Sequence, residues 1–301
     1  KKTKLLVGPW SHQIAPWGRV PMGDNGEYAD RTFGKQALSD VIEMHMHWYD
    51  QQLKGIDTGI DDEAPIRLFV MGANEWHDEY EWPLARTEWS KYYLHSSGNA
   101  ESNGGSLSLD APTEEEPTDK FTYDPENPVA SLGSQYQTYD FCGPHDRSEL
   151  QKRDDILTFT TTPLEEDTEV TGPIRATIWA SSDAVDTDFT AALTDVEPDG
   201  KAIALCEGIV RARFRNGTDN PKMMTPGEIY EFEIDMWNTS NMFKKGHSIR
   251  VEISSSNFPR YNRNLNTGNP IATDAEIRTA NQTIYHGAAN PSHLTLPVIS
   301  R

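Results

Sequence analysis

Positively charged residues are scarce in this chain. Its 301 residues include 27 Lys and Arg against 47 Asp and Glu, which gives a formal net charge of −20. Nucleic acids and anionic membrane surfaces are bound through clusters of Lys and Arg, so this balance argues against both as partners. The sequence also has no run of about 18 apolar residues, the length that a membrane-spanning helix needs. We therefore expect neither a nucleic-acid partner nor a membrane partner.

Cysteine is nearly absent too. The two cysteines, Cys142 and Cys206, are too few for the disulfide framework of a small secreted domain, and leave a free pair or a single bridge open. The sequence starts at Lys1, with no initiator Met and no signal peptide, so we expect it to continue a longer protein. A cytoplasmic and a secreted location both stay open.

Apolar residues are plentiful enough for a folded core, since 36% of the chain is hydrophobic and it holds 8 Trp, 11 Tyr and 10 Phe. Residues 4–7 read as a short buried parallel strand that ends at Gly8-Pro9. A polar, glycine-rich loop follows, and apolar residues at steps of three and four predict a helix over residues 32–53. Strand, loop and helix in this order are typical of an α/β architecture, which we expect to end near residue 63.

Beyond residue 63 the apolar pattern changes to a period of two, which predicts strands separated by turns. The expected strands cover residues 65–72, 91–96, 155–164, 172–182, 188–200, 202–214, 228–236 and 248–256. Eight strands and no second long helix predict an antiparallel β-sandwich of the jelly-roll type. Residues 99–154, rich in Asn, Gly, Asp, Glu and Pro, are expected to wrap around it as long loops.

One histidine stands where an α/β enzyme places catalytic groups. His12 follows "LLVGPWS" directly after the first predicted strand, and loops at the carboxyl ends of such strands carry active-site residues. An α/β-hydrolase places its general base in such a position. From this stretch alone, a structural role in a turn remains the alternative.

Several motifs together resemble the C-terminal half of the CocE/NonD hydrolases, the group of X-Pro dipeptidyl-peptidases, cocaine esterase and α-amino-acid ester hydrolases. They are "LLVGPWSHQ", "YDQQLKG", "FVMGANEWHDEYEWP", "YDPENPV", "VTGPIRATIWASSDAVDTDFTAALTDVEPDGKAI" and "PGEIYEFEIDMWNTSNMFKKGHSIRVEISSSNFPRYNRN". The resemblance implies that residues 1–63 are the C-terminal end of an α/β-hydrolase domain and that residues 64–301 form a jelly-roll domain of galactose-binding-like type. It also implies that His12 is the histidine of a Ser-Asp-His triad.

The sequence departs from this family in one respect, because it contains no Gly-x-Ser-x-Gly nucleophile elbow. The resemblance therefore implies that Ser and Asp come from an upstream α/β-hydrolase domain or chain, and that these 301 residues alone are inactive. The expected substrate is a peptide or an acyl ester, with peptides slightly favoured. No cofactor and no metal are expected, and a homo-oligomer stays open. The alternative is a non-catalytic jelly-roll module for carbohydrate binding or assembly.

Several further residues are candidates for a site. The resemblance places Trp10, Trp76 and His77 near the substrate side, with interdomain packing as the alternative for His77. His45 and His47 lie two residues apart on the predicted helix, and so point away from each other rather than toward one metal ion. The acids of "SSDAVDTDF" could suit calcium, although turn capping is the better interpretation. The segment "SSSNFPRYNRN" resembles a sugar-binding surface, but a structural role is favoured.

Overall fold

A computed structural model describes residues 3–11, 22–135 and 141–300 of the chain. Its helical elements are α1 (Val41–Tyr49), a π-helical turn at Asp50–Lys54 and four short 3-10 turns at Lys35–Ala37, Ala100–Ser102, Leu150–Lys152 and Ala212–Phe214. Its strands are β1 (Leu5–Val7), β2 (Glu27–Tyr28), β3 (Arg31–Thr32), β4 (Ile66–Val70), β5 (Glu75–Glu79), β6 (Thr87–His95), β7 (Gly105–Ser108), β8 (Asp119–Tyr123), β9 (Leu157–Thr160), β10 (Thr168–Ser182), β11 (Asp188–Val196), β12 (Ala202–Arg211), β13 (Tyr230–Phe243), β14 (Ser248–Ser254), β15 (Ala280–Tyr285) and β16 (His293–Ile299).

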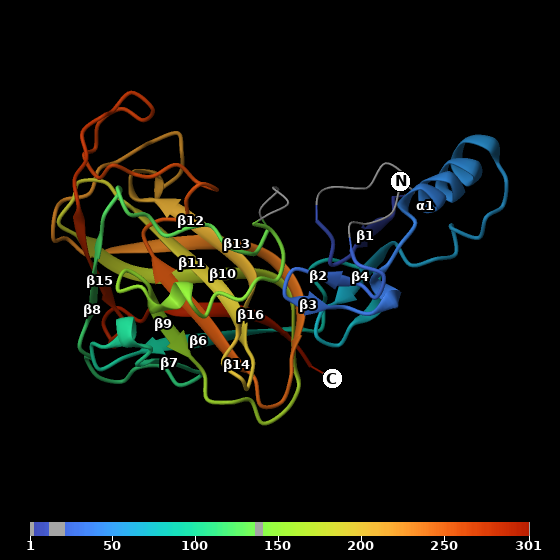
Figure 1. Ribbon diagram of the computed structural model, residues 1–301, viewed down its shortest axis with the longest axis horizontal. Coiled ribbons are helices and arrows are strands. Elements are labelled where there is room, and N and C mark those ends of the chain that lie inside the picture. The colour runs from blue at the N-terminus through green and yellow to red at the C-terminus, as the bar shows by residue number, and fades with distance from the viewer. Residues whose placement is uncertain (1–2, 12–21, 136–140, 301) are drawn as a thin grey trace.

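Strands β6 to β16 make up the larger part of the molecule, on the left of Figure 1. Within the described residues they are hydrogen-bonded into one eleven-stranded sheet, in the order β12-β11-β14-β9-β7-β6-β16-β10-β15-β8, with β13 also paired to β10. Its ladders are antiparallel except for β7 with β9. One apolar core contains side chains from all eleven strands. This part of the chain is a mostly β domain.

The pattern of β13 explains how this core forms. Apolar side chains alternate with acids along the strand, so one face of the pleat is buried and the other meets water. The buried set is Phe232, Ile234 and Met236, and the exposed set is Glu231, Glu233 and Asp235. Burying one such apolar side chain contributes about 1.5–3 kcal/mol. All eight strands predicted after residue 63 are present, with ends that differ by a few residues.

Residues 99–154 are more regular than the prediction of long loops. They contain β7 and β8, which pair with β6 and β15 respectively. Both strands are only four or five residues long and carry polar residues on one face, so their alternation is too brief to stand out in the sequence. Strands β2, β3, β5, β15 and β16 are not predicted from the sequence either.

The strand predicted over residues 4–7 is β1, which pairs in parallel with β4, while β4 pairs with β5 on its other edge. The expectation that β1 is buried is wrong for this chain, since Leu5 is 48% exposed and Val7 47% exposed. Among the described residues β1 has only one neighbouring strand, and this leaves its second edge uncovered.

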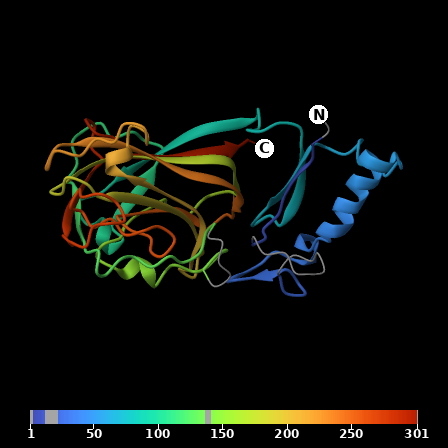
Figure 2. The same cartoon turned by 90° about the horizontal axis from the view of Figure 1, so that it is seen from above.

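The helix predicted over residues 32–53 is shorter. It begins at Val41, because the carboxylate of Asp40 accepts a hydrogen bond from the Glu43 amide at 2.9 Å and caps the first turn. Leu38, with an extended ψ of 135°, separates α1 from the 3-10 turn upstream. At the other end the helical run continues through the π-helical turn to Lys54, close to the predicted end, and Gly55 stops it. No residue of α1 is buried, and Figures 1 and 2 show the helix at the end of the molecule away from the large sheet.

Backbone hydrogen bonds join the small sheet to the large one. The Met71 amide donates to Ser240 O at 3.0 Å, and the Met242 amide donates to Met71 O at 2.7 Å. The domain boundary expected between residues 63 and 64 stays a prediction. Strands β4 and β5 come after residue 63 in the chain, yet they are hydrogen-bonded into one sheet with β1, which comes before it.

The structure answers the open question about the cysteines, since Cys142 and Cys206 are both buried and do not form a disulfide with each other. Burial in the sheet raises the pKa of the Cys206 thiol, so this cysteine is a packing residue rather than a reactive one. None of the helices in the described part of the chain is both long enough and apolar enough to cross a membrane.

Candidate functional site

The turn after β1 fixes the position of Trp10. A Cβ atom on Gly8 would lie 2.4 Å from the Trp10 ring, so only glycine lets the indole fold back over this turn. The indole Nε1 donates a hydrogen bond to Ala37 O at 2.7 Å. The sequence Gly-Pro-Trp therefore places a rigid aromatic ring directly before Ser11 and His12. His12 itself lies outside the described residues.

Of the two other predicted pocket residues, one lies beside Trp10. The rings of Trp10 and Trp76 are 5.7 Å apart between centroids, and Trp76 Nε1 donates to Gln36 O at 2.7 Å. His77 is the next residue of β5, so its side chain points to the opposite face of the strand. There its Nε2 lies 4.0 Å from Glu75 Oε2. The structure thus groups Trp10 with Trp76 and separates His77 from them.

A cavity of about 470 Å³ lies next to this aromatic pair, between the small sheet and the large one. Its wall on the N-terminal side includes Leu5, Val7, Trp10 and Ser11. The Ser11 hydroxyl is buried and makes no hydrogen bond to a described residue. The described residues that line the cavity include no charged side chain, so the space suits an uncharged, largely apolar group.

The opposite wall comes from the β-rich domain, through Ser134, Gln135 and residues 142–144, together with residues 238–240 of β13. Sequence reasoning missed these residues. The only sequence signal for this loop was its pair of glycines, Gly133 and Gly143, which both adopt a positive φ in the structure. A Cβ on Gly143 would lie 2.5 Å from the Tyr28 ring. The Tyr28 hydroxyl in turn lies 2.6 Å from Cys142 Sγ, which ties the N-terminal wall to this loop.

A buried ion pair holds the base of this loop. Arg147 is 4% exposed, and its Nη1 donates to Leu132 O at 2.5 Å. Its Nε and Nη2 donate to the two oxygens of Glu252, at 2.9 and 2.6 Å. Burial alone would lower the pKa of Arg147, but the Glu252 carboxylate raises it above its usual value, so the guanidinium stays charged. Backbone hydrogen bonds between Ser134 and Gly143 close the loop above it.

A second polar contact fixes the hairpin of β2 and β3 against the large sheet. Arg31 Nη1 donates to Asn241 Oδ1 at 3.1 Å, and Nη2 forms an ion pair with the buried carboxylate of Asp195. The other oxygen of Asp195 lies 2.8 Å from His247 Nδ1. Because Tyr28 and Phe33 flank Arg31 and line the cavity, this contact sets the distance between its two walls.

The remaining candidates lie away from this cavity. His45 Nδ1 bonds to Val41 O at 2.7 Å and His47 faces Glu43, so the pair does not converge. Asp183 caps the Asn281 amide at 2.9 Å. Asp186 and Asp188 are paired with arginines. Within residues 3–11, 22–135 and 141–300, no three His, Cys, Asp or Glu side chains are grouped to hold a metal ion.

Comparison with known proteins gives one matching family model. Residues 58–295 match the model described as the X-Pro dipeptidyl-peptidase C-terminal non-catalytic domain. The turn with Trp10 and the position of His12 precede this matched region. The chain is 45% identical to cocaine esterase from Rhodococcus sp. (strain MB1 Bresler), over 99% of this chain and 52% of that protein.

Two solved structures have a fold similar to that of this chain. A crystal structure of an aminopeptidase from a marine sediment Thaumarchaeota archaeon is similar with a TM-score of 0.79 and 25% identity, over 99% of this chain and 50% of that one. An α-amino acid ester hydrolase is similar in fold, with a TM-score of 0.81, 24% identity and coverage of 98% and 50%. The chain therefore spans about half the length of these relatives.

Proposed function

The chain belongs to the CocE/NonD hydrolases and carries their X-Pro dipeptidyl-peptidase-type C-terminal domain, and on this premise we propose that it forms part of a serine hydrolase that cleaves acyl esters. In this proposal His12 is the general base of a Ser-Asp-His triad. An upstream α/β-hydrolase domain or chain, the expected partner, provides the Ser, the Asp and the oxyanion donors.

The observation that carries the proposal is the similarity to cocaine esterase, which at 45% identity extends over 99% of this chain. It therefore includes most of the first 57 residues, which precede the region matched by the non-catalytic model. His12 belongs to that first stretch. A similarity limited to the β-rich domain would have supported only a non-catalytic module.

The cavity supports an ester with an uncharged acyl group. Its lining is apolar with a few neutral polar groups, and Trp10 and Ser11 directly precede His12 in the chain. In the proposed complex, Trp10 forms an aromatic wall against the acyl group, and Trp76 packs beside Trp10 and supports it. His77 lies on the other face of β5, so we assign it to packing between the two parts of the protein.

We further propose that residues 1–63 complete an α/β-hydrolase domain and that residues 64–301 form the jelly-roll domain. The uncovered second edge of β1 supports an α/β-hydrolase domain, since a parallel sheet normally continues on both sides. The parallel partner of β1 in this chain, β4, lies just beyond residue 63, so the sheet itself crosses the proposed boundary. The exposed apolar residues of α1 also support an α/β-hydrolase domain, because a helix of an α/β domain covers a sheet.

The proposed mechanism uses His12 twice. The imidazole takes the proton of the Ser hydroxyl as that oxygen attacks the ester carbonyl, and gives it to the leaving alcohol when the acyl-enzyme forms. A water molecule then loses its proton to His12 and attacks the acyl-enzyme, and the same proton returns to Ser. The 301 residues alone contain no nucleophile elbow and are inactive in this proposal.

The test uses the protein expressed from its complete reading frame, assayed with p-nitrophenyl esters and with X-Pro p-nitroanilides. We expect ester hydrolysis and a loss of at least ~10³-fold in kcat for His12→Ala, as for removal of a triad member. His47→Ala, beside Glu43 on the polar face of α1, is the matched control and should keep full activity. Undiminished hydrolysis in His12→Ala would remove His12 from the mechanism.

A peptidase is the second candidate, because the aminopeptidase structure covers 99% of this chain with a TM-score of 0.79. Faster turnover of X-Pro p-nitroanilides than of the p-nitrophenyl esters would favour it. A complete reading frame without a Gly-x-Ser-x-Gly elbow would instead leave a non-catalytic module.

A further inference from the structure

A second cavity, of about 320 Å³, lies in the β-rich domain, in a different part of the domain from the wall that faces Trp10. It is formed by the end of β12, the 3-10 turn that follows it, and the long connection between β14 and β15. A volume near 300 Å³ is at the lower end of the range for small-molecule sites. Nothing in the proposed hydrolase mechanism uses this cavity.

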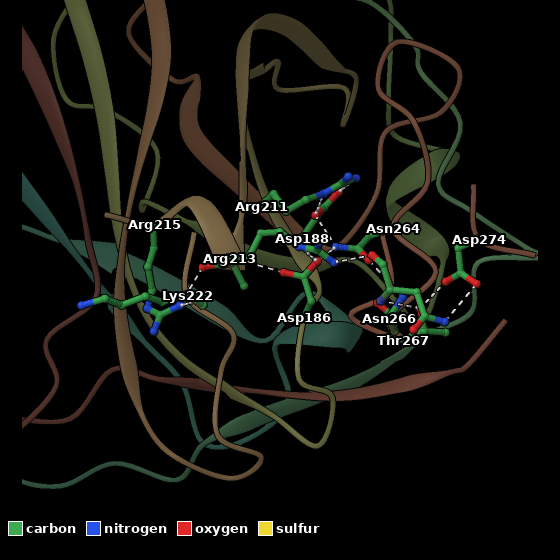
Figure 3. A network of polar contacts seen from close by, with 12 residues as sticks. Asp186, Asp188, Arg211, Arg213, Arg215, Lys222, Asn264, Asn266, Thr267 and Asp274 are labelled. Carbon is green, nitrogen blue, oxygen red and sulfur yellow. Dashed lines mark hydrogen bonds and ion pairs between the residues drawn. The ribbon is translucent and has the colours of Figure 1, made fainter. Parts of the chain in front are cut away.

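The floor of the cavity is a buried polar network, drawn in Figure 3. Arg211 Nε and Nη2 donate to the two oxygens of Asp188, at 2.8 and 3.0 Å. Arg213 Nε donates to Asp186 at 2.8 Å. Asn264 Nδ2 donates to both carboxylates, at 2.9 and 2.8 Å, and so locks the two ion pairs together.

This network is unlike ordinary core packing. Asp186 is 0% exposed and Asp188 2% exposed, and burial raises the pKa of Asp188 despite its contact with Arg211. Replacing buried ion pairs by apolar side chains of similar volume is often neutral or stabilising, so a buried ion pair is weak evidence for a purely stabilising role. The effect of the network is to hold the two guanidinium groups in fixed positions at the cavity wall, as a pre-organised binding site requires.

The guanidinium groups keep hydrogen-bond donors for a ligand. Arg211 Nη1 and Arg213 Nη1 make no hydrogen bond to any residue that the structure describes. Arg263, also in the wall, uses only Nη1, which donates to Pro125 O at 2.7 Å. Its side chain lies over the Phe258 ring, 5.4 Å from the centroid, and Phe258 is 40% exposed.

Acceptors complete the wall. Asp274, which lines the cavity, accepts hydrogen bonds from Thr267 and from Asn269 Nδ2, the latter at 3.1 Å. The three guanidinium groups are matched in number by the carboxylates of Asp186, Asp188 and Asp274. A site without net charge, with donors and acceptors side by side and an exposed ring at its edge, suits a neutral ligand whose groups both donate and accept.

We propose that this cavity binds a neutral carbohydrate of the size of one pyranose ring. Sugar hydroxyls accept from Arg211, Arg213 and Arg263 and donate to Asp274, and the C–H face of the ring packs on Phe258. The segment "SSSNFPRYNRN" then has both a structural role and a sugar-binding role, the two alternatives raised by its sequence. Asn264 is structural, while Phe258 and Arg263 contact the ligand.

The test is saturation-transfer NMR on the 301-residue chain with a panel of neutral methyl glycosides, with inorganic phosphate and glucuronate as anionic probes. Arg263→Gln removes an arginine of the wall that forms no ion pair with a carboxylate among the described residues. Arg278→Gln is the matched control, because Arg278 lies on the same connection but bonds to Asp183 O and does not line the cavity. Thermal melting of both variants checks that they fold.

We expect at least one neutral glycoside to bind saturably, with its affinity about tenfold lower in Arg263→Gln and unchanged in Arg278→Gln, a loss near 1.4 kcal/mol. Addition of 10-fold excess phosphate should not displace it. Absence of binding across the panel, equal binding by Arg263→Gln, or saturable binding of phosphate or glucuronate alone would each overturn the proposal. Because hydrolysis is not measured, the result is independent of the proposed esterase function.

Discussion

His247 and Asp195 form a hydrogen bond of 2.8 Å between Nδ1 and Oδ1, beside the ion pair of Asp195 with Arg31. The hydrogen bond to Asp195 raises the pKa of His247, an effect that the Glu197 charge strengthens and the Arg31 charge weakens. A raised pKa in the folded state stabilises the fold below the unfolded pKa of about 6.5, and this stabilisation is lost as the pH rises through the folded value.

The first prediction follows from this contact. His247→Gln should lower the free energy of unfolding by about 1 kcal/mol at pH 5.5 and by clearly less at pH 9. The value at pH 5.5 is modest because the His247 side chain is partly exposed and solvent screens its charge. Urea denaturation at both pH values measures it, with the exposed His45→Gln as control. An equal loss at both pH values would mean that the charge on His247 does not contribute.

The second prediction concerns the buried pair below the cavity loop. Arg147→Ala leaves Glu252 buried without its counter-charge and should lower the free energy of unfolding by about 3–5 kcal/mol. Arg175→Ala is the control, because Arg175 pairs with Glu233 on the surface, where both side chains are more than half exposed. We expect about 0–1 kcal/mol for it. Similar losses in the two variants would contradict the importance of burial.

The third prediction concerns the uncovered helix. Ile42, Met46 and Leu53 are 50%, 49% and 74% exposed, and such apolar patches promote association. The 301-residue chain should therefore self-associate at micromolar concentration in sedimentation velocity. A triple change to Ser should shift it toward monomer, while Leu109→Ser, at a site 62% exposed on the β-rich domain, should not. A monomeric parent chain would contradict this.

The fourth prediction concerns backbone conformation. Trp237 has a φ of 66°, a region that costs about 1–2 kcal/mol for residues other than glycine, and its side chain is 57% exposed. Trp237→Gly should raise the free energy of unfolding by about 0.5–1 kcal/mol. Trp89→Gly, at a site 53% exposed within β6, should lower it, because glycine only adds chain entropy there. Guanidinium titrations of both variants distinguish the cases, and a loss in Trp237→Gly would show that side-chain contacts outweigh the strain.

The long strands could be predicted from the sequence because their pattern is local. Buried residues alternate with more exposed ones over residues 174–180 of β10 and 230–236 of β13, and this period is visible without the fold. The first turn was predictable for the same reason, since Gly8-Pro9 ends an apolar run. Short strands such as β7 and β8 offer too few alternations to be recognised.

The cavity could be predicted only on one side. Trp10 and Trp76 follow from the family motifs, but the opposite wall begins only at Ser134 and extends to Ser240, far along the chain from both. The contacts that join the walls, Arg31 with Asn241 and Tyr28 with Cys142, connect residues 210 and 114 positions apart. No period or spacing in the sequence encodes such pairs. The roles of His12, Trp10, Trp76 and His77 stay predictions.

The ion pair of Arg31 with Asp195 also limits how the protein can be divided. A truncated form that starts at residue 58, where the family model begins to match, would lose the cation that neutralises a carboxylate deep within β11. It would also remove β1, so β4 would lose its parallel hydrogen-bonded neighbour. Expression vectors for the β-rich part are therefore best designed to retain the hairpin of β2 and β3, and proteolysis should spare that hairpin for as long as the large sheet stays folded.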